Sequence, residues 1–317
     1  MCAAPSAVQR LTEWLDLGSV HGPVYDQSWS PDGALLATAD YDQVMVWDMA
    51  TGSEAAVLRG LTSFVTGLGW SPDGLLLASA SQDGTVCLYG SPGLAQTACL
   101  QIGEALGCLA WSPDGRLLAV GSYEGAIHIV DVASRALLAS WSTDTIDERR
   151  DDVISIAWSP DGGTIASGDL EGNIRLWDVA TRQARLGFRE RTTDHARDAN
   201  GLSWSPDGSM LASAHPDGQI QLWSTATGQM ARAISAHSGP AVDVAWSPDG
   251  EYLASIGYSD RRVCLWNPQT GLLCAEAGPV TLPGWSVSWS PDSTKLASGC
   301  GEWQQAHVGA TTVWAIP

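Results

Sequence analysis

Serine, histidine and aspartate residues recur in this sequence in an arrangement that could support nucleophilic catalysis. His195 is followed by Ser213 and Asp217, and these three residue types make up the triad of many hydrolases. The sequence contains no Gly-x-Ser-x-Gly nucleophile elbow, no His-Glu-x-x-His motif and no phosphate-binding loop, which would strengthen such an interpretation. We therefore expect no catalytic residue, no metal site and no cofactor.

The cysteines do not form a pattern that predicts covalent or metal cross-links. There are seven of them, an odd number, and no Cys-x-x-Cys pair occurs. Cys87, Cys108 and Cys264 lie within apolar runs, where cysteine packs as a small hydrophobic residue. We therefore predict buried thiols rather than a framework of disulfide bonds or a zinc site.

The charge balance narrows the range of partners. The 317 residues include 16 Lys and Arg against 35 Asp and Glu, which gives a formal net charge of −19. Such a surface repels phosphate groups, so nucleic acids and anionic membranes are disfavoured as partners. The charge either keeps a single domain soluble or marks an acidic face for a basic partner.

No segment has the pattern of an export signal or a membrane span. Residues 1–20 lack a basic start followed by an apolar stretch, and no run of 18 apolar residues occurs. Those are the features of signal peptides and membrane-spanning helices. We therefore expect a cytoplasmic protein.

A five-residue string divides the chain into repeats. Trp-Ser-Pro-Asp-Gly occurs six times, and a seventh copy at Trp289 reads Trp-Ser-Pro-Asp-Ser. Successive copies lie 41 to 47 residues apart, and a period in the low forties with such turn signals is typical of four-stranded propeller blades. The tryptophans of the first six copies are Trp29, Trp70, Trp111, Trp158, Trp204 and Trp246.

Each repeat has the pattern of three apolar strands followed by a more polar fourth strand. An apolar run leads into the Trp, Ser-Pro-Asp-Gly forms a tight turn, and a second apolar run follows. Acidic-Gly pairs such as Asp83-Gly84 form the next hairpin, and the third run ends near a large aromatic residue such as Trp177. The inner runs suit strands that neighbouring sheets cover on both faces. One blade cannot bury both faces alone, so the repeats must fold as one ring.

These repeats resemble those of the WD-repeat family, and the resemblance covers nearly all of the chain. The Trp-Asp ending of the third run is present at Trp47-Asp48 and Trp177-Asp178. The resemblance implies an all-β, seven-bladed β-propeller with four-stranded antiparallel blades in a single domain, residues 1–317. The near-identical copies resemble bacterial members, which often form the sensing or assembly part of larger signalling proteins. The expected blade cores are residues 24–58, 65–101, 106–141, 153–188, 199–234, 241–276, and 284–316 with 11–18.

The number of strands predicts how the ring closes. Seven repeats supply seven sets of three inner strands, but the seventh set lacks an outer strand because Pro317 follows soon after Trp314. A spare strand-like segment lies near the N-terminus, at residues 11–17. We expect this segment to pair as the outer strand of the last blade and so to tie the ring shut.

The resemblance offers a structural role for the Ser, His and Asp residues. In the family, a His before the first strand, a Ser or Thr on the second, an Asp in the hairpin and the Trp of the third form a hydrogen-bonded staple. Blade two has Leu61 at the His position and blade four has Arg149, so both lack this staple. All four places are matched by His195, Ser213, Asp217 and Trp223, and three by His237, Ser255 and Trp266, with Asp260 as a displaced fourth.

The resemblance also places partner binding on one face of the ring, which we call the upper face. The loops before the first strands, the hairpins between second and third strands and the mouth of the central channel share this face. Long loops precede blades four and five, at residues 143–152 and 189–198, and the first contains Arg149 and Arg150. Their mixed charges fit either salt bridges between the loops or contacts with a partner.

Aromatic residues outside the repeat pattern cluster on the upper face. Trp303 lies in a hairpin that is longer than its counterparts, and Trp285 stands four residues before the Trp of its repeat. Tyr25 holds the same place in blade one. Aromatic side chains with a polar rim are typical of binding hot spots. The candidate partner site therefore comprises Trp285, Trp303, Tyr25, Tyr41, Phe64 and Tyr123, with Arg149 and Arg150 beside them.

Three functions remain open from the sequence. The first is a scaffold that holds a protein or peptide on the upper face. The second is a small-molecule binder at the channel mouth, with Trp285, Tyr25 and Trp303 as walls. The third is an enzyme with carboxylates near the channel, and a strongly shifted carboxylate pKa would favour it. The carboxylates in question are Asp26, Asp40 and Asp243.

Overall fold

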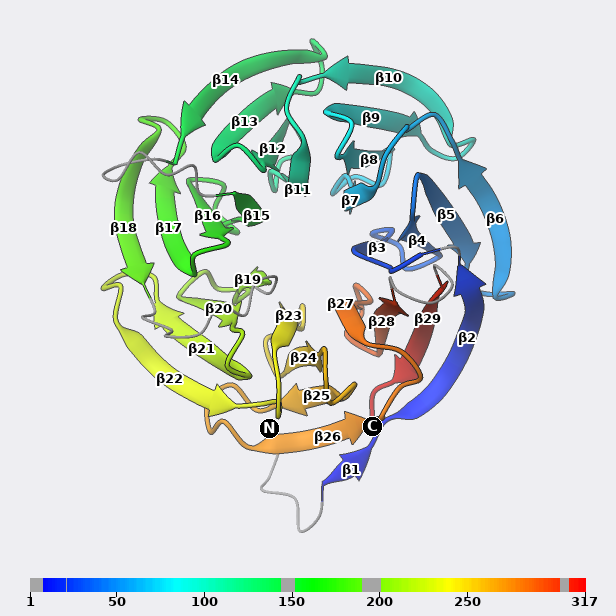
Figure 1. The fold of residues 1–317 in the computed structure, drawn as a ribbon, viewed down its shortest axis with the longest axis vertical. Helices are drawn as coiled ribbons and strands as arrows, with labels where there is room; N and C mark the ends of the chain where they lie inside the picture. Colours follow the sequence, from blue (N-terminus) through cyan, green and yellow to red (C-terminus); the bar gives the residue numbers. More distant parts are fainter. Residues whose placement is uncertain (1–7, 21, 144–151, 190–200, 303–307) are drawn as a thin grey trace.

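The chain folds into a ring of seven β-sheets around a central channel (Figure 1). The computed structural model describes residues 8–20, 22–143, 152–189, 201–302 and 308–317. Every helix or strand assigned within these ranges is a strand, β1 to β29. The first strand of each blade lies nearest the channel. The predicted all-β, seven-bladed propeller is confirmed.

In each blade, antiparallel strands follow one another from the channel to the rim. Blade one contains β3 (Gln27–Trp29), β4 (Leu35–Asp40), β5 (Gln43–Asp48) and β6 (Ser53–Leu58). Blade two contains β7 (Val65–Trp70), β8 (Leu76–Ser81), β9 (Thr85–Gly90) and β10 (Ala95–Gln101). Blade three contains β11 (Leu106–Trp111), β12 (Leu117–Ser122), β13 (Ala126–Asp131) and β14 (Ala136–Ser142). Blade four contains β15 (Val153–Trp158), β16 (Thr164–Asp169), β17 (Asn173–Asp178) and β18 (Gln183–Arg189).

The remaining blades repeat this order. Blade five contains β19 (Leu202–Trp204), β20 (Met210–Ala214), β21 (Gln219–Ser224) and β22 (Met230–Ser235). Blade six contains β23 (Ala241–Trp246), β24 (Leu253–Gly257), β25 (Val263–Trp266) and β26 (Leu273–Ala277). Blade seven contains β27 (Gly284–Trp289), β28 (Lys295–Glu302) and β29 (Val308–Ala315), and its outer strand is β2 (Thr12–Val20).

The Ser-Pro-Asp turns carry the same hydrogen bonds in every blade. In blade one, Ser30 Oγ donates to Asp32 Oδ1 at 2.6 Å and accepts the backbone N–H of Leu35. The hydrogen bond from the Ser30 hydroxyl has the largest effect in lowering the pKa of Asp32, and a hydrogen bond from a backbone N–H lowers it further. Gly33 has a φ of 70°, in the left-handed region that glycine adopts readily. The other serine–aspartate pairs are Ser71–Asp73, Ser112–Asp114, Ser159–Asp161, Ser205–Asp207, Ser247–Asp249 and Ser290–Asp292.

The hydrophobic core lies between neighbouring blades as well as within them. Ile256 and Leu265 of blade six pack in one cluster with Trp289 and Leu296 of blade seven. Ile256, Leu265 and Leu296 are each fully buried. Because each blade uses its neighbours to cover its faces, the ring is the unit that buries apolar surface.

The N-terminal segment closes the ring, as predicted. β2 pairs antiparallel with β29, and Leu15 lies opposite Val313. The structure adds a contact that was not predicted, because β1 (Gln9–Arg10) pairs in parallel with β26 of blade six. The backbone N–H of Leu11 continues this contact to Glu276 O at 2.9 Å. One N-terminal segment therefore links blades six and seven.

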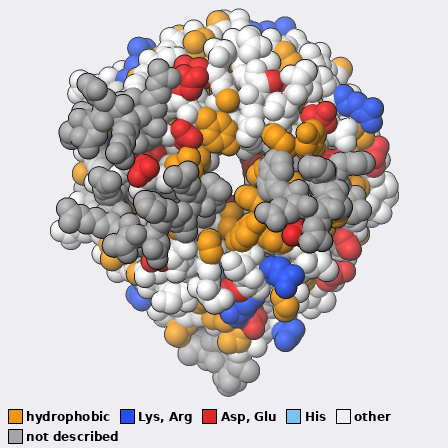
Figure 2. All heavy atoms as spheres, viewed as in Figure 1, with side chains coloured by type: hydrophobic (Ala, Val, Ile, Leu, Met, Phe, Trp, Pro, Cys, Tyr) orange, Lys and Arg blue, Asp and Glu red, His pale blue; other side chains and the backbone are white. Residues whose placement is uncertain are grey.

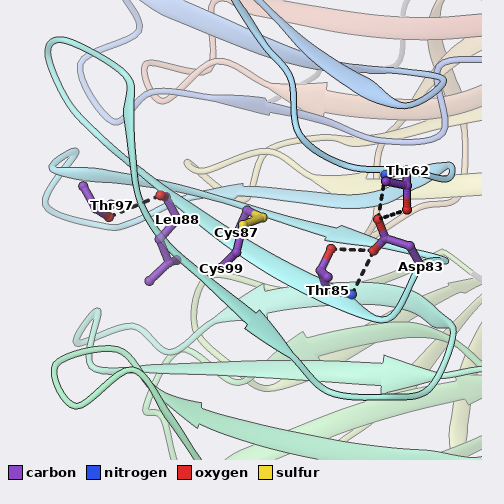
Figure 3. The surroundings of a disulfide bond; sticks show 7 residues. All are labelled: Thr62, Asp83, Thr85, Cys87, Leu88, Thr97 and Cys99. Atoms are coloured by element: carbon purple, nitrogen blue, oxygen red, sulfur yellow. Dashed lines mark hydrogen bonds between the residues drawn. A yellow bond between two sulfur atoms is a disulfide. The ribbon is translucent and has the colours of Figure 1, made fainter.

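The prediction that the cysteines form no disulfide bond is wrong in blade two. Cys87 on β9 and Cys99 on β10 are directly opposed across the hairpin and form a disulfide bond, with Cα atoms 4.1 Å apart (Figure 3). Their pairing depends on the strand register and not on a cysteine motif, so the sequence pattern did not reveal it. Cys108 and Cys264 are buried free thiols, and burial raises the pKa of Cys264 to about 12.

Candidate binding face and channel

Blade six contains a hydrogen-bonded chain from its third strand to the loop before its first strand. Trp266 Nε1 donates to Ser255 Oγ at 2.9 Å, and this hydroxyl lies 2.8 Å from His237 Nε2. His237 Nδ1 lies 3.1 Å from the Asp260 carboxylate in the hairpin. Burial disfavours the charged carboxylate, but hydrogen bonds from His237 and from backbone N–H groups outweigh burial and lower the pKa of Asp260. The four side chains therefore tie together four parts of one blade, namely two strands, the hairpin between them and the loop before the first strand.

Blade five has a related chain that contains His215. Trp223 Nε1 donates to Ser213 Oγ at 2.9 Å, and this hydroxyl lies 2.6 Å from His215 Nε2. The predicted His195 lies outside the described residues, and His215 holds the place beside Ser213. Burial lowers the pKa of His215 to about 4, so its imidazole is neutral at physiological pH. Asp217 accepts a backbone N–H within its own hairpin.

Blades two and four, which lack the histidine, are tied by other side chains. In blade two, Asp83 accepts hydrogen bonds from the backbone N–H and the hydroxyl of Thr62, which precedes the first strand (Figure 3). In blade four, Arg175 donates to Asp169 at 2.8 Å within one hairpin. The residue types differ from blade to blade, but in each case a carboxylate fixes the hairpin.

The rim of blade three contains a Ser-His-Glu chain that sequence reasoning missed. His128 Nδ1 lies 2.8 Å from Ser140 Oγ, and His128 Nε2 lies 3.1 Å from Glu104. Ser140 and His128 are register partners on β14 and β13, so the contact is a cross-strand link. None of these three residues lines the central channel or the grooves on either side of blade five.

Five aromatic rings form a continuous chain beside the channel mouth, and we call them the aromatic cluster. Tyr41 contacts Phe64 with ring centroids 4.6 Å apart, and Phe64 lies 6.4 Å from Tyr25. Tyr25 lies 5.1 Å from Trp285, which lies 5.4 Å from Tyr258. Tyr41 and Tyr258 are each 37% exposed. Figure 2 shows hydrophobic side chains gathered around the central opening on this face.

The structure brings together four of the six aromatic residues predicted for the partner site, namely Tyr25, Tyr41, Phe64 and Trp285. Tyr123 lines the channel cavity from blade three. Trp303, Arg149 and Arg150 lie outside the described residues.

Tyr258 belongs to the aromatic cluster, and sequence reasoning missed it. It directly follows the second strand of blade six, just as Tyr41 and Tyr123 directly follow the second strands of blades one and three. Alignment of the repeats at this single position would therefore have revealed it. Only aromatic residues at places where one repeat differs clearly from the others were considered in the sequence, and this tyrosine was therefore missed.

The channel contains a cavity of about 530 Å³ that opens beside the aromatic cluster. Residues from all seven blades line it, including Tyr25 and Trp285 of the cluster. Its wall also contains two carboxyl groups, Asp26 of blade one and Asp243 of blade six. The cavity therefore combines an aromatic mouth with an acidic wall.

Asp26 and Asp243 occupy equivalent positions, three residues before the Trp of their repeats. Asp26 accepts the backbone N–H of Leu68 in blade two at 2.7 Å, and Asp243 accepts that of Val287 in blade seven at 2.8 Å. Burial raises the pKa of each carboxyl group to about 7, although these hydrogen bonds oppose the shift. Each carboxyl group ties its blade to the next blade.

A raised carboxyl pKa would favour an enzyme, but burial accounts for these two shifts, and the oxygen atoms of both groups are engaged by the backbone. The second oxygen of Asp26 accepts the backbone N–H of Gln27, and that of Asp243 accepts the backbone N–H of Val244. Both oxygens of each group therefore hold backbone N–H groups. Asp40, the third candidate, accepts a hydrogen bond from Gln43 within its hairpin and does not line the channel cavity.

The described residues contain neither a metal-binding cluster nor a membrane-spanning helix. Across the described ranges, no group of three or more His, Cys, Asp or Glu side chains is placed to hold a metal ion. The same part of the chain contains no helix with the length and apolar character needed to cross a membrane.

Comparisons with known protein families agree with the fold. Residues 16–48, 52–90, 141–178 and 228–267 match the family described as WD domain, G-beta repeat. Residues 95–148 and 188–246 match the family described as anaphase-promoting complex subunit 4 WD40 domain. No curated protein matches the chain significantly. The seven-bladed ring and the repeat matches support a WD-repeat family, whose propellers are commonly protein-interaction scaffolds and typically not enzymes.

Proposed function

We propose that this protein is a cytoplasmic interaction scaffold that binds a protein or peptide through its upper face. The observation that carries the proposal is the aromatic cluster, in which rings from blades one, two, six and seven contact one another beside the channel. Exposed Tyr and Trp side chains supply large contact areas at a low entropic cost. The hydrogen-bonded blades beneath hold these rings in fixed positions.

The partner binds through a basic segment. Asp26 and Asp243 line the same cavity as Tyr25 and Trp285, and the chain carries a net charge of −19. A Lys or Arg side chain at this mouth would contact aromatic ring faces and approach two carboxyl groups. The negative field would speed its association and would disfavour nucleic acids and anionic membranes.

The partner complex is part of a signalling assembly of bacterial type. The near identity of the seven Ser-Pro-Asp turns supports this assignment through the resemblance to bacterial WD-repeat proteins. In those proteins the propeller often senses a signal or assembles other components.

The channel cavity supports a second candidate function. Its volume of about 530 Å³ lies within the range of small-molecule sites. In this alternative, Tyr25 and Trp285 would hold a small ligand. Catalysis is less well supported, because the Asp26 and Asp243 oxygens are engaged by backbone N–H groups.

Selection from a random peptide library displayed on phage would test the scaffold proposal. The selected peptides should be enriched in Lys and Arg, and calorimetry on the best peptide gives its Kd. Tyr41→Ala and Tyr258→Ala each remove a partly exposed ring and should weaken binding at least about tenfold. Trp14→Ala is the matched control, because Trp14 is 43% exposed on the outer strand β2 and contacts Lys295. It should leave the Kd unchanged.

The proposal would be wrong if the selected peptides bound Tyr41→Ala and Tyr258→Ala as tightly as the unmodified protein. A selection that yields no binding peptide would also contradict it and would turn attention to small molecules. Each variant must first have the melting temperature of the unmodified protein.

A further inference from the structure

The indole N–H groups of the repeat tryptophans provide an internal comparison among the seven blades. In five blades, the Nε1 atom donates to a backbone carbonyl of the preceding blade at 2.7 to 3.2 Å. The acceptor is always the residue just before the preceding blade's own Trp. The five pairs are Trp29–Ser288, Trp111–Gly69, Trp158–Ala110, Trp204–Ala157 and Trp289–Ala245.

Trp246, at the joint between blades five and six, departs from this rule. The rule predicts Ser203 O as its acceptor, but Trp246 Nε1 is buried and has no partner among the described residues. Ser203 contacts it differently, because its hydroxyl accepts the backbone N–H of Trp246 at 3.0 Å. A buried donor without an acceptor is uncommon and needs an explanation. The indole N–H of Trp70 is also buried without a partner among the described residues. Trp70, however, lines neither the central channel nor the grooves on either side of blade five.

Trp246 lines a groove of about 480 Å³ between blades five and six. The groove contains Pro206 of a Ser-Pro-Asp turn and Pro268 after the third strand, so it lies at the opposite ends of the strands from the upper face. Met210, Leu222 and Ala231 supply apolar wall. Charged side chains line it as well, namely Asp207, Asp249 and Arg232, and its volume lies within the range of small-molecule sites.

The equivalent groove between blades four and five differs from this groove in the side chains that fill it. There, Arg185 crosses the groove to Thr164 Oγ1 at 3.3 Å, and Trp204 Nε1 has its carbonyl partner. Arg185 is the bulged residue of its outer strand, and Ala231 is the bulged residue of the next blade. Thr164 starts its second strand, and Met210 starts the next one. The polar crossing of one groove is therefore replaced by two apolar side chains in the other.

We propose that the groove between blades five and six binds a neutral, largely apolar small molecule whose carbonyl or ether oxygen accepts the Trp246 indole hydrogen bond. The charges at the groove explain why the ligand is neutral. Asp207 and Asp249 line it and repel anions. The guanidinium of Arg232 donates to the carbonyl oxygens of Gln269 and Thr270, so it is already engaged. This site is independent of the upper face.

NMR of the uniformly ¹⁵N-labelled full chain tests this site directly. The Trp246 indole signal is assigned as the one lost in Trp246→Phe. Acetanilide, ethyl benzoate and cyclohexanone serve as neutral probes with one carbonyl group, and toluene and benzoate serve as probes without a neutral acceptor. At least one neutral carbonyl probe should shift the Trp246 signal saturably and selectively among the 16 tryptophans. Toluene and benzoate should bind at least about tenfold more weakly.

Two variants distinguish binding in this groove from binding elsewhere on the protein. Ala231→Arg introduces the side chain that fills the neighbouring groove, and it should weaken probe binding at least about tenfold while the melting temperature is retained. Trp246→Phe should weaken the carbonyl probes, measured by calorimetry, but not toluene. Tyr258→Ala, which alters the upper face, should change nothing.

Either of two results would overturn the assignment. The first is that none of the three carbonyl probes shifts the Trp246 signal saturably. The second is that Ala231→Arg binds the probes as tightly as the unmodified protein. Both results leave the peptide-binding proposal untouched, because its readouts depend on the aromatic cluster at the other face.

Discussion

Single hydroxyl groups hold the large aromatic side chains inside the blades. In blades one, four and seven, a Ser or Thr on the second strand accepts the indole N–H of the third-strand Trp at 2.8 to 3.0 Å. A buried donor left without an acceptor costs about 1–3 kcal/mol, so each hydroxyl permits a Trp to be buried there. The pairs are Trp47–Thr38, Trp177–Ser167 and Trp314–Ser298.

Ser255→Ala should lower the free energy of unfolding by about 2–3 kcal/mol, because it leaves Trp266 Nε1 and His237 Nε2 without their shared partner. Urea unfolding followed by tryptophan fluorescence measures the change. Ser288→Ala is the matched control. The Ser288 hydroxyl is buried and has no partner among the described residues, so its removal should change stability by less than about 0.5 kcal/mol. Equal losses in both variants would contradict the role given to Ser255.

Among the strands, β2 has a special position because it joins the start of the chain to the last blade. It lies at the rim of blade seven, against β29, while β1 continues the same segment along the rim of blade six. Every other blade takes its four strands from one stretch of chain. The strength of the closure therefore depends on a pairing between segments about 300 residues apart in sequence.

Deletion of residues 1–18 should destabilise the ring severely, because blade seven loses its outer strand and Leu17 leaves a buried cluster. We expect a fall in Tm of more than about 10 °C or loss of the cooperative transition, measured by calorimetry. Deletion of residues 1–10 removes only β1 and should cost about 5 °C or less.

A synthetic peptide of residues 8–20, added in trans, should restore part of the lost Tm to the variant that lacks residues 1–18. An unchanged Tm on that larger deletion would refute closure by β2.

The repeats made most of this architecture predictable, because a turn string recurring at one period fixes blade number and strand order. The closure followed from the same count. Contacts that depend on strand register or on neighbouring blades were not predictable in this way. Predicting the Cys87–Cys99 bond requires the register of the hairpin. Predicting the contact between Tyr258 and Trp285 requires the distance between blades six and seven. Predicting that the indole N–H of Trp246 has no partner among the described residues also requires the distance between blades.

At the scale of the whole ring, the blades meet around the channel, and their joints are chemically unequal. The joints between blades one and two and between blades six and seven contain a carboxyl group, Asp26 or Asp243, that bonds to the next blade. At the equivalent position in blade three, the thiol of Cys108 lies 3.7 Å from Val153 O of blade four. The ring therefore has two joints whose protonation changes near neutral pH.

This inequality predicts how the stability of the ring depends on pH. The folded pKa of Asp26 and of Asp243 is about 7, against 3.8 for an unperturbed carboxyl group. Between these values the folded state binds more protons than the unfolded state, so stability is greatest at the low end and falls as pH rises through 7. From pH 5.5 to 7.5, the expected loss is up to about 2 kcal/mol for each group.

The turn aspartates act in the opposite direction and in a lower pH range. The serine hydroxyl and backbone N–H groups hold the pKa of Asp292 at about 2 and lower that of Asp32. Their contribution is present above the unfolded pKa near 4 and is lost as pH falls further. Stability should therefore be greatest between about pH 4 and 6.

Urea midpoints measured from pH 4 to 8 should rise to this maximum and then fall, whereas Asp26→Asn/Asp243→Asn should give a flatter profile above pH 5.5. Each Asn keeps one acceptor oxygen and one of the two backbone hydrogen bonds, so the double variant should be less stable at pH 5 but closer to the unmodified protein at pH 8. Ser288→Ala should keep the full pH dependence, since it changes no titrating group. Parallel profiles for the unmodified protein and the double variant would show that these two carboxyl groups do not control the joints.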